Sequence, residues 1–272
     1  TGNGFKRDDS WIFQSTATFI NSGTRLMDID ADGMTDYVQY DQFSSGAQVY
    51  VNRAVNPVDL LTAVNNGIGG RTEIEYGSSA HQDNDFLPFV VPVVKSVTAS
   101  DNFSGNSYRT EYSYREGLWD GEDREFRGFG IVTVQDPAGN RSVSHFLQDD
   151  IYKGLMSSQE VFNNDGTSTA AISNWDNQDL GNGVKFVFLR RSLSLLYRNN
   201  ASVKATAQEF FYEETPQLGN LTKVINFGEV DPAAHTDIGT DSRTIETQYL
   251  NNTTGTNHLI GLPKQTIVKN HF

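Results

Sequence analysis

The stretch DIDADGMTD, residues 28–36, places carboxylates at its first, third, fifth and ninth positions. A backbone that curls around a cation brings such carboxylates together, and the glycine at the sixth position permits the tight turn. We expect Asp28, Asp30, Asp32 and Asp36 to bind through their side chains and Met34 through its carbonyl oxygen. Oxygen ligands in a flexible loop favour Ca²⁺ over softer metals. The stretch therefore predicts a structural calcium site.

The segments around this loop favour strands over the helices of an EF-hand. An EF-hand loop needs a bidentate acid at its twelfth position, where this sequence has Gln39. Residues 35–40 and 46–52 instead predict a strand and its hairpin partner. The acid spacing resembles the loops of FG-GAP (integrin-type) β-propellers. The alternative is a solvated acidic turn without metal, although four carboxylates this close repel one another strongly without a cation.

Alternation of apolar and polar residues recurs along the whole chain, and helical periodicity is nearly absent. Turn sequences such as Asn66-Gly67 and Asn182-Gly183 separate the alternating segments. This pattern predicts an all-β fold built from antiparallel sheets. Besides the pair beside the Asp-rich loop, the expected strands are residues 11–20, 71–76, 93–100, 108–114, 130–135, 142–147, 157–162, 184–189, 205–212, 221–227 and 244–249.

Composition excludes several classes of function. With 21 Lys and Arg against 34 Asp and Glu in 272 residues, the net charge of −13 should repel nucleic acid and anionic membranes. The chain has no cysteine, which excludes disulfides and thiolate metal sites. No apolar run approaches the roughly 18 residues of a membrane span. No signal peptide opens the chain, so we expect a fragment whose export signal would lie upstream.

The sequence shows no pattern of a catalytic site, and we expect the chain not to be an enzyme. The five histidines are scattered and lack metal-binding spacing. Adjacent carboxylates such as Asp149 and Asp150 would point to opposite faces of a strand, which argues against a paired acid and base. A hydrolase hidden in an all-β frame is the remaining enzymatic alternative. It would require a pocket with two convergent carboxylates of raised pKa.

Several segments resemble one family of bacterial toxins. DLLTAVNNGIGGRTEIEY (59–76) resembles a segment of toxin-complex (Tc) B subunits, Rhs-type proteins and Salmonella-type virulence proteins. PFVVPVV (88–94) resembles the family's proline-bracketed run. REFRGFG (124–130) resembles its EREFRGFG signature, with Asp123 in place of the usual first acid. Further segments that fit are QDD (148–150), KG (153–154) and LIGLP (259–263).

The resemblance implies a fold and a function. It implies the end of an FG-GAP-type propeller in residues 1–55, an antiparallel β-sandwich in 56–155 and Rhs/YD-like shell strands in 156–272. The chain would be a non-catalytic structural module of a large secreted bacterial toxin, located outside the cell or on its surface. Its partners would be a pore-forming chain and a toxic C-terminal cargo. The alternative is an adhesion module that binds glycan or protein, favoured if Trp11, Trp119 or Trp175 cluster in one groove.

The run at 124–130 also has a physical interpretation of its own. Its arginines lie among acids, which predicts charge-assisted hydrogen bonds at a corner of a sheet. Its phenylalanines would be apolar anchors, and its glycines would allow a bulge or a close backbone approach. A catalytic cluster of the same acids and arginines is the alternative. The residues concerned are Arg124 and Arg127, Phe126 and Phe129, Gly128 and Gly130, with the acids Glu122, Asp123 and Glu125.

Overall fold

The structure, a computed structural model, describes residues 23, 25–40, 47–52, 59–101, 103–199, 201–214, 218–254 and 259–271. The chain divides into two units, Thr1–Leu60 and Leu61–Phe272. The described residues of the first unit form a three-stranded sheet, and those of the second form one thirteen-stranded sheet. Their one helical element is a short 3-10 turn, Ser79–His81. The expectation of an all-β, antiparallel fold is therefore confirmed.

The sheet of the first unit consists of β1 (Arg25–Met27), β2 (Asp36–Tyr40) and β3 (Ala47–Tyr50), all antiparallel. The pair β2–β3 confirms the hairpin expected from residues 35–40 and 46–52. β1 was not predicted; it pairs with β2 so that Met27 lies opposite Asp36. The Asp-rich stretch is thus the loop that connects two paired strands. The strand expected at residues 11–20 lies outside the described residues.

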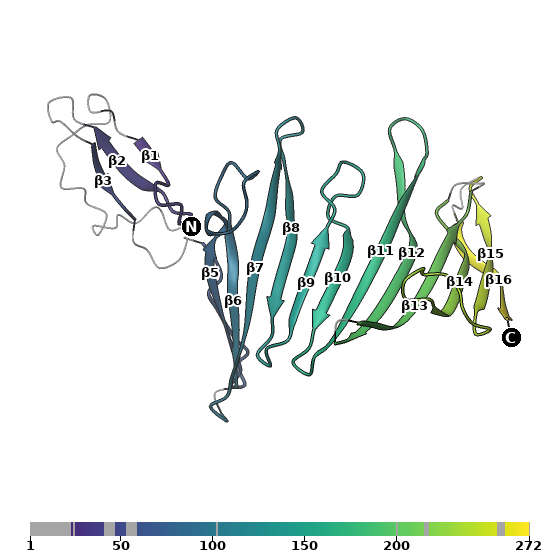
Figure 1. The fold of residues 1–272 in the computed structure, drawn as a ribbon. Coiled ribbons are helices and arrows are strands. Elements are labelled where there is room, and N and C mark those ends of the chain that lie inside the picture. The colour runs from purple at the N-terminus through teal and green to yellow at the C-terminus, as the bar shows by residue number, and fades with distance from the viewer. Residues whose placement is uncertain are drawn as a thin grey trace. The chain divides into compact units, whose positions relative to one another are not determined.

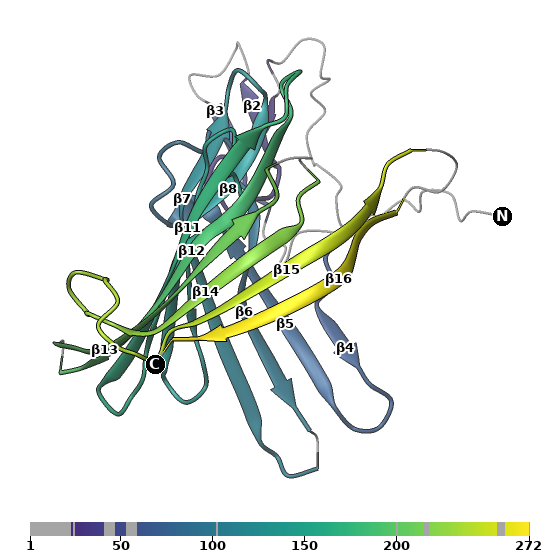
Figure 2. The same ribbon diagram turned by 90° about the vertical axis from the view of Figure 1, so that its right-hand side faces the viewer.

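The sheet of the second unit is a meander in which every strand pairs with its neighbours in the sequence. Figure 1 shows these strands side by side in chain order, and in Figure 2 β15 and β16 cross in front of β5 and β6 because the sheet is twisted. The strands are β4 (Ala63–Asn65), β5 (Arg71–Ser78), β6 (Pro92–Ser100), β7 (Ser107–Asp120), β8 (Glu125–Gln135), β9 (Arg141–Phe146), β10 (Met156–Phe162), β11 (Thr167–Asp179), β12 (Lys185–Arg198), β13 (Ala201–Tyr212), β14 (Leu221–Val230), β15 (Arg243–Asn252) and β16 (Leu259–Asn270).

The β-sandwich expected within residues 56–155 is wrong for the described part of the chain. Strands β4 to β10 belong to the same sheet as β11 to β16, and β9 pairs with β10 across residue 155. Alternation along a strand predicts that its two faces differ, but it does not indicate whether a second sheet covers one of them. The division into 1–55, 56–155 and 156–272, like the propeller assignment of the first part, stays a prediction.

The main hydrophobic core of the second unit lies on one face of β11–β14. Ala170, Leu195, Ala205 and Val230 lie directly opposite one another in adjacent strands, and all four are buried. The connection between β14 and β15 turns back beside this row, because Val230 also bridges to Asp237. Elsewhere the described residues expose more large apolar side chains than they bury. Most of the sheet is therefore a single layer.

One face of β5–β7 carries a row of charged residues. Glu75 accepts hydrogen bonds from Lys95, Ser96 and Arg109, at 2.9, 3.0 and 2.9 Å. The bonds from Lys95, then those from Ser96 and Arg109, lower the pKa of Glu75 to about 2. This face is therefore suited to contact with water.

No helix among the described residues has the length and apolar composition to cross a membrane.

Candidate functional site

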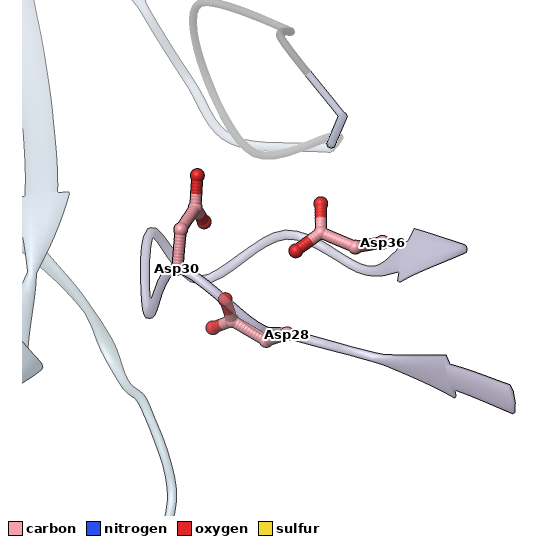
Figure 3. A group of neighbouring side chains, drawn as sticks. All are labelled: Asp28, Asp30 and Asp36. Carbon is pink, nitrogen blue, oxygen red and sulfur yellow. The ribbon is translucent and has the colours of Figure 1, made fainter. Parts of the chain in front are cut away.

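The Asp-rich loop brings three of its four carboxylates together. Asp28 follows β1, Asp30 lies in the loop and Asp36 is the first residue of β2 (Figure 3). One carboxylate oxygen from each of the three lies within 4.8 Å of the other two. Asp36 is buried, whereas Asp30 is exposed. The loop can turn this tightly because Gly33 takes a left-handed backbone conformation, with φ of 89°.

Backbone N–H groups hold two of these carboxylates in place. Asp28 accepts hydrogen bonds from Asp32 N at 3.1 Å and Gly33 N at 2.9 Å. Asp36 accepts one from Ile29 N at 2.9 Å and one from Asn52 N at 2.7 Å. The second bond joins the start of β2 to the residues after β3. These bonds fix the side chains and offset part of their mutual repulsion.

Two of the five expected calcium ligands are not part of this group. The Asp32 carboxylate accepts a hydrogen bond from Met34 N at 2.7 Å and is not among the three clustered carboxylates. The Met34 carbonyl oxygen makes no contact in the described structure that would mark it as a ligand. A set of carboxylate oxygens is the donor chemistry that Ca²⁺ prefers. The residues present therefore fit a calcium ion, while the five-ligand set and the metal itself stay predictions.

The signature run at 124–130 forms a buried ion-pair corner. The guanidinium of Arg127 has no exposed side-chain surface, and its Nη2 lies 2.9 Å from Asp120, 2.7 Å from Asp123 and 2.6 Å from Asp150. Burial acts to lower the pKa of Arg127, but the hydrogen bond and charge of Asp150, with Glu125 and Asp120, outweigh it and raise the pKa. We call Arg127 and these four acids the Arg127 corner. Charge-assisted hydrogen bonds at a sheet corner, as expected from the sequence, are confirmed for Arg127.

A β-bulge places Arg127 in this corner. Between the pairs Gly117↔Phe129 and Trp119↔Phe126, β7 advances by two residues and β8 by three. The extra residue lies beside Gly128, whose φ of 82° favours glycine. The bulge brings the rings of Phe126 and Phe129 into edge-to-face contact, with their ring centroids 5.4 Å apart. The expected bulge and apolar anchors are thus confirmed.

The close approach expected at the second glycine is also present. A Cβ atom built on Gly130 would lie 2.8 Å from Glu116 Oε2 and 3.0 Å from Gln148 Oε1. The amide of Gln148 in turn donates to the carbonyl oxygens of Glu116 and Gly128, both at 2.9 Å. Gly130 therefore leaves room for the residues that join the β7–β8 hairpin to the segment after β9.

Sequence reasoning missed two acids of the Arg127 corner. Asp120 ends β7, and Asp150 lies in the connection between β9 and β10. The backbone N–H of Asp123, with that of Glu122 and the Arg127 side chain, lowers the pKa of Asp120, so this acid stays ionised. From the sequence, the QDD segment was noted for its resemblance and for its adjacent acids Asp149 and Asp150, but not for a contact with Arg127. Its pairing with Arg127 is not visible in the sequence because it spans 23 residues.

The tryptophans described here do not share a groove. Trp119 lies in β7, where its ring contacts the ring of Phe89 edge to face, with the ring centroids 5.1 Å apart. Trp175 lies in β11, and its Nε1 donates to the Met156 carbonyl oxygen at 2.9 Å. Three strands separate β7 from β11 in the sheet. Trp11 lies outside the described residues, so the feature that would favour an adhesion module is not met by the other two.

Comparison with known families places this corner in context. A family model described as the insecticide toxin TcdB middle/N-terminal region matches residues 1–160, which include both the Asp-rich loop and the Arg127 corner. The chain belongs to this family. The resemblance to toxin-complex B subunits stated from the motifs is thereby confirmed. No curated protein matches the chain.

Solved toxin structures share the fold of the family member described here. A Tc holotoxin pore of Photorhabdus luminescens matches 98% of the chain with a TM-score of 0.72 at 15% identity. The complex TcdB2-TccC3 without its hypervariable C-terminal region matches 98% with a TM-score of 0.69 at 16% identity. The chain spans only 17% of each of these solved chains. At this identity, the likeness shows the fold.

Proposed function

We propose that the chain is a structural segment of a toxin-complex shell, in which the thirteen-stranded sheet forms part of the wall. Membership of the toxin family and the fold shared with the two toxin structures support this proposal. The mostly single-layered sheet supports it further, because such a sheet encloses a large space with few residues. In this proposal the parent protein is secreted.

The observation that carries the proposal is the edge strand β16. It is 12 residues long and, within the described residues, it pairs only with β15. A long edge strand with apolar side chains is a site for pairing with another strand unless it is covered. Here the edge exposes Leu259, Ile260, Leu262, Ile267 and Val268. We therefore propose that a further strand of the parent protein continues the sheet at β16.

A density map of the complete protein that the gene encodes tests this proposal. It should show another strand hydrogen-bonded to the outer edge of β16 and the sheet continuing into a closed wall. An outer edge of β16 that faces solvent in the assembled protein would contradict the proposal.

The proposed partners are other chains or segments of a toxin complex. The solved relatives are a holotoxin pore and a TcdB2-TccC3 complex. By analogy we propose that this chain's parent protein assembles with a pore-forming chain and encloses a toxic cargo. The first unit, as the end of a propeller, would contribute the surface that docks onto the pore. The acidic net charge gives no support to a role in nucleic-acid binding.

A non-catalytic role is supported by the state of the carboxylates. Each described carboxyl group with a shifted pKa has it lowered, as for Glu75, Asp120 and Asp231. An acid catalyst instead needs a carboxyl group of raised pKa. The clustered acids of the Arg127 corner all contact a buried arginine. We therefore assign these charges to the stability of the sheet corner.

We also propose that Asp28, Asp30 and Asp36 hold a structural calcium ion in the first unit. The ion would screen three adjacent carboxylates and fix the connection between β1 and β2. Asp32 and the Met34 carbonyl would complete the ligand set after a local rotation of the loop. Because Asp36 also bonds to Asn52 N, the ion would stabilise all three strands.

Calcium titration by calorimetry tests this site. We expect binding by the wild-type chain, and a rise in the stability of the first unit of about 2.7 kcal/mol at a hundredfold excess of Ca²⁺ over the dissociation constant. Asp30→Ala should abolish both effects, because it removes an exposed oxygen ligand with little effect on the fold. Asp179→Ala, which replaces an exposed acid at the end of β11 in the second unit, is the matched control. Unchanged binding by Asp30→Ala would refute the site.

A further inference from the structure

A cavity of about 450 Å³ lies at the end of the sheet where β11 turns into β12 and where β13 ends. Figure 1 shows the β11–β12 hairpin projecting at this end. The volume is within the range of sites that hold small molecules. The lining combines aromatic rings, side-chain amides and two opposite charges, which restrict the chemistry of a ligand. We call this the Arg190 cavity, and its lining includes Asn177, Gln178, Phe188, Arg190, Tyr212 and Glu214.

Aromatic rings give the cavity a fixed apolar surface. The ring centroids of Phe188 and Tyr212 lie 4.8 Å apart, and the Phe186 ring packs against both, with centroid distances of 5.5 and 5.7 Å. Burial raises the pKa of Tyr212, so its hydroxyl stays protonated at neutral pH. Among the described residues this hydroxyl has no hydrogen-bond partner. The rings therefore offer an apolar surface with a hydrogen-bond donor beside it.

Arg190 brings a positive charge to the cavity without an acid that neutralises it. Its Cζ atom lies 4.3 Å from the centroid of the Phe211 ring, which also lines the cavity, and its Nη1 donates to the Phe210 carbonyl oxygen at 3.3 Å. No carboxylate in the described part of the chain forms an ion pair with it. Glu209 pairs instead with the next arginine, Arg191, at 3.5 Å. A guanidinium held in this way is suited to bind a carboxylate.

Donors and acceptors stand beside this charge. The Asn177 Nδ2 donates to the Tyr152 hydroxyl at 2.6 Å, which holds the amide in place. The Asn177 Oδ1 and the Gln178 side-chain amide have no partner within the described ranges. Glu214, which is exposed, adds two acceptor oxygens to the lining. Because a hydroxyl group both donates and accepts, a ligand rich in hydroxyls can satisfy this mixed set.

The charges and the amides argue against other classes of ligand. A multiply charged anion such as a phosphate would be repelled by Glu214. An apolar ligand would leave the Arg190 guanidinium and the Gln178 amide without water and without a partner, which is costly. An acidic protein side chain would satisfy the guanidinium but would leave the amides and the ring surface unused. A sugar ring with a single carboxylate meets all of these constraints, because the ring separates its carboxylate from Glu214.

We propose that the Arg190 cavity binds a single sugar-acid unit, which is a pyranose ring with one carboxylate group. The carboxylate binds to Arg190. The apolar face of the ring packs on Phe188 and Tyr212. The hydroxyls bond to Gln178 and Glu214. This function goes beyond a role in the wall, and it is independent of the strand pairing at β16, which two strands separate from β13.

Calorimetric titration of the 272-residue chain tests the cavity. The probes are glucuronic acid and N-acetylneuraminic acid, with glucose as the neutral reference. We expect at least one of the two acids to bind about tenfold more tightly than glucose, because hydrogen bonds between charged groups are the stronger ones. Binding of neither acid would overturn the proposal, and so would equal binding of both acids and glucose.

Two further probes define the ligand. Glutaric acid carries a carboxylate without a sugar ring, and we expect it to bind about tenfold more weakly than the preferred sugar acid. Equally tight binding of glutaric acid would mean that an acidic protein side chain suffices, and it would overturn the proposal. The methyl glycoside of the preferred acid distinguishes two sources of the same chemistry: undiminished binding identifies the end of a glycan, and lost binding identifies a free sugar acid.

Substitutions assign the binding to this cavity. Arg190→Gln should keep the thermal unfolding midpoint but lose the roughly tenfold preference for the acid over glucose. Arg198→Gln, which removes an exposed arginine at the other end of β12, is the matched control and should bind as the wild type does. If Arg190→Gln fails to fold, Gln178→Ala provides the test, with binding of the sugar acid weakened about threefold. Unchanged binding by folded Arg190→Gln or by Gln178→Ala would overturn the site.

Discussion

Replacing Arg127 with methionine is expected to lower the midpoint of thermal unfolding of the second unit by roughly 5–10 °C. The guanidinium is fully buried and contacts acids from β7, from the turn that follows it and from the connection after β9. Without it, Asp120, Asp123 and Asp150 would repel one another at the same corner. Since Asp123 and Asp150 are mostly exposed, part of this cost is relieved by water.

Two further variants separate the charge of the Arg127 corner from its geometry. Arg127→Lys should recover little of the loss, because the lysine ammonium ends one bond short of the Nη2 position, which contacts all three acids. Arg124→Gly is the matched control: it removes an exposed arginine of the same turn, at a φ of 53° that glycine adopts without strain. Calorimetry of all three would refute this account if Arg127→Met unfolded at the wild-type temperature, or if Arg124→Gly were equally damaging.

Replacing Leu195 with alanine is expected to destabilise the second unit by about 3 kcal/mol. Leu195 is 4% exposed and lies in the buried row with Ala170, Ala205 and Val230. The small residues opposite it cannot move to fill the cavity that the substitution leaves. Chemical denaturation of the isolated chain measures the change in the free energy of unfolding.

The neighbouring residue is the control for this substitution. Leu196 points to the other face of β12 and is 36% exposed, so Leu196→Ala should cost well under half as much. Equal effects of the two substitutions would mean that both faces of β12 are covered. That result would contradict the description of this part of the sheet as buried on one face.

The sequence was informative where local chemistry decides the structure. The Arg127 corner could be predicted because its bulge glycine, one of its acids and both phenylalanines lie within seven consecutive residues. The hairpin β2–β3 was predicted for the same reason. Both features depend on alternation and turn residues, which act over short distances.

Strands with local irregularities escaped prediction. β11 is rich in polar residues, and a register shift at Asn174 and Trp175 interrupts its alternation. β16 contains Gly261 at a φ of 77° and Pro263, which usually mark turns; both lie beside register shifts of the β15–β16 pair, where such residues are tolerated. Their existence depends on pairing with β12 and β15, which the sequence of either strand alone does not reveal.

The candidate calcium site shows the same limit. Acid spacing predicted that Asp28, Asp30 and Asp36 converge, and they do. It did not predict that Asp32 would bond to Met34 N. Carboxylate spacing defines which residues can reach a common point, whereas competition from backbone N–H groups decides which of them turn toward it. The calcium titration tests whether the carboxylates that do converge bind an ion.

Hydrogen exchange at β16 tests the central claim, that this chain is one stretch of a continuous wall, most directly. The amides of β16 that are not bonded to β15 should exchange at least tenfold more slowly in the complete assembled protein than in the isolated chain. Amides of β12, which is paired on both sides, should be protected in both samples and serve as the reference. Equally fast exchange of the outer β16 amides in both samples would contradict the claim.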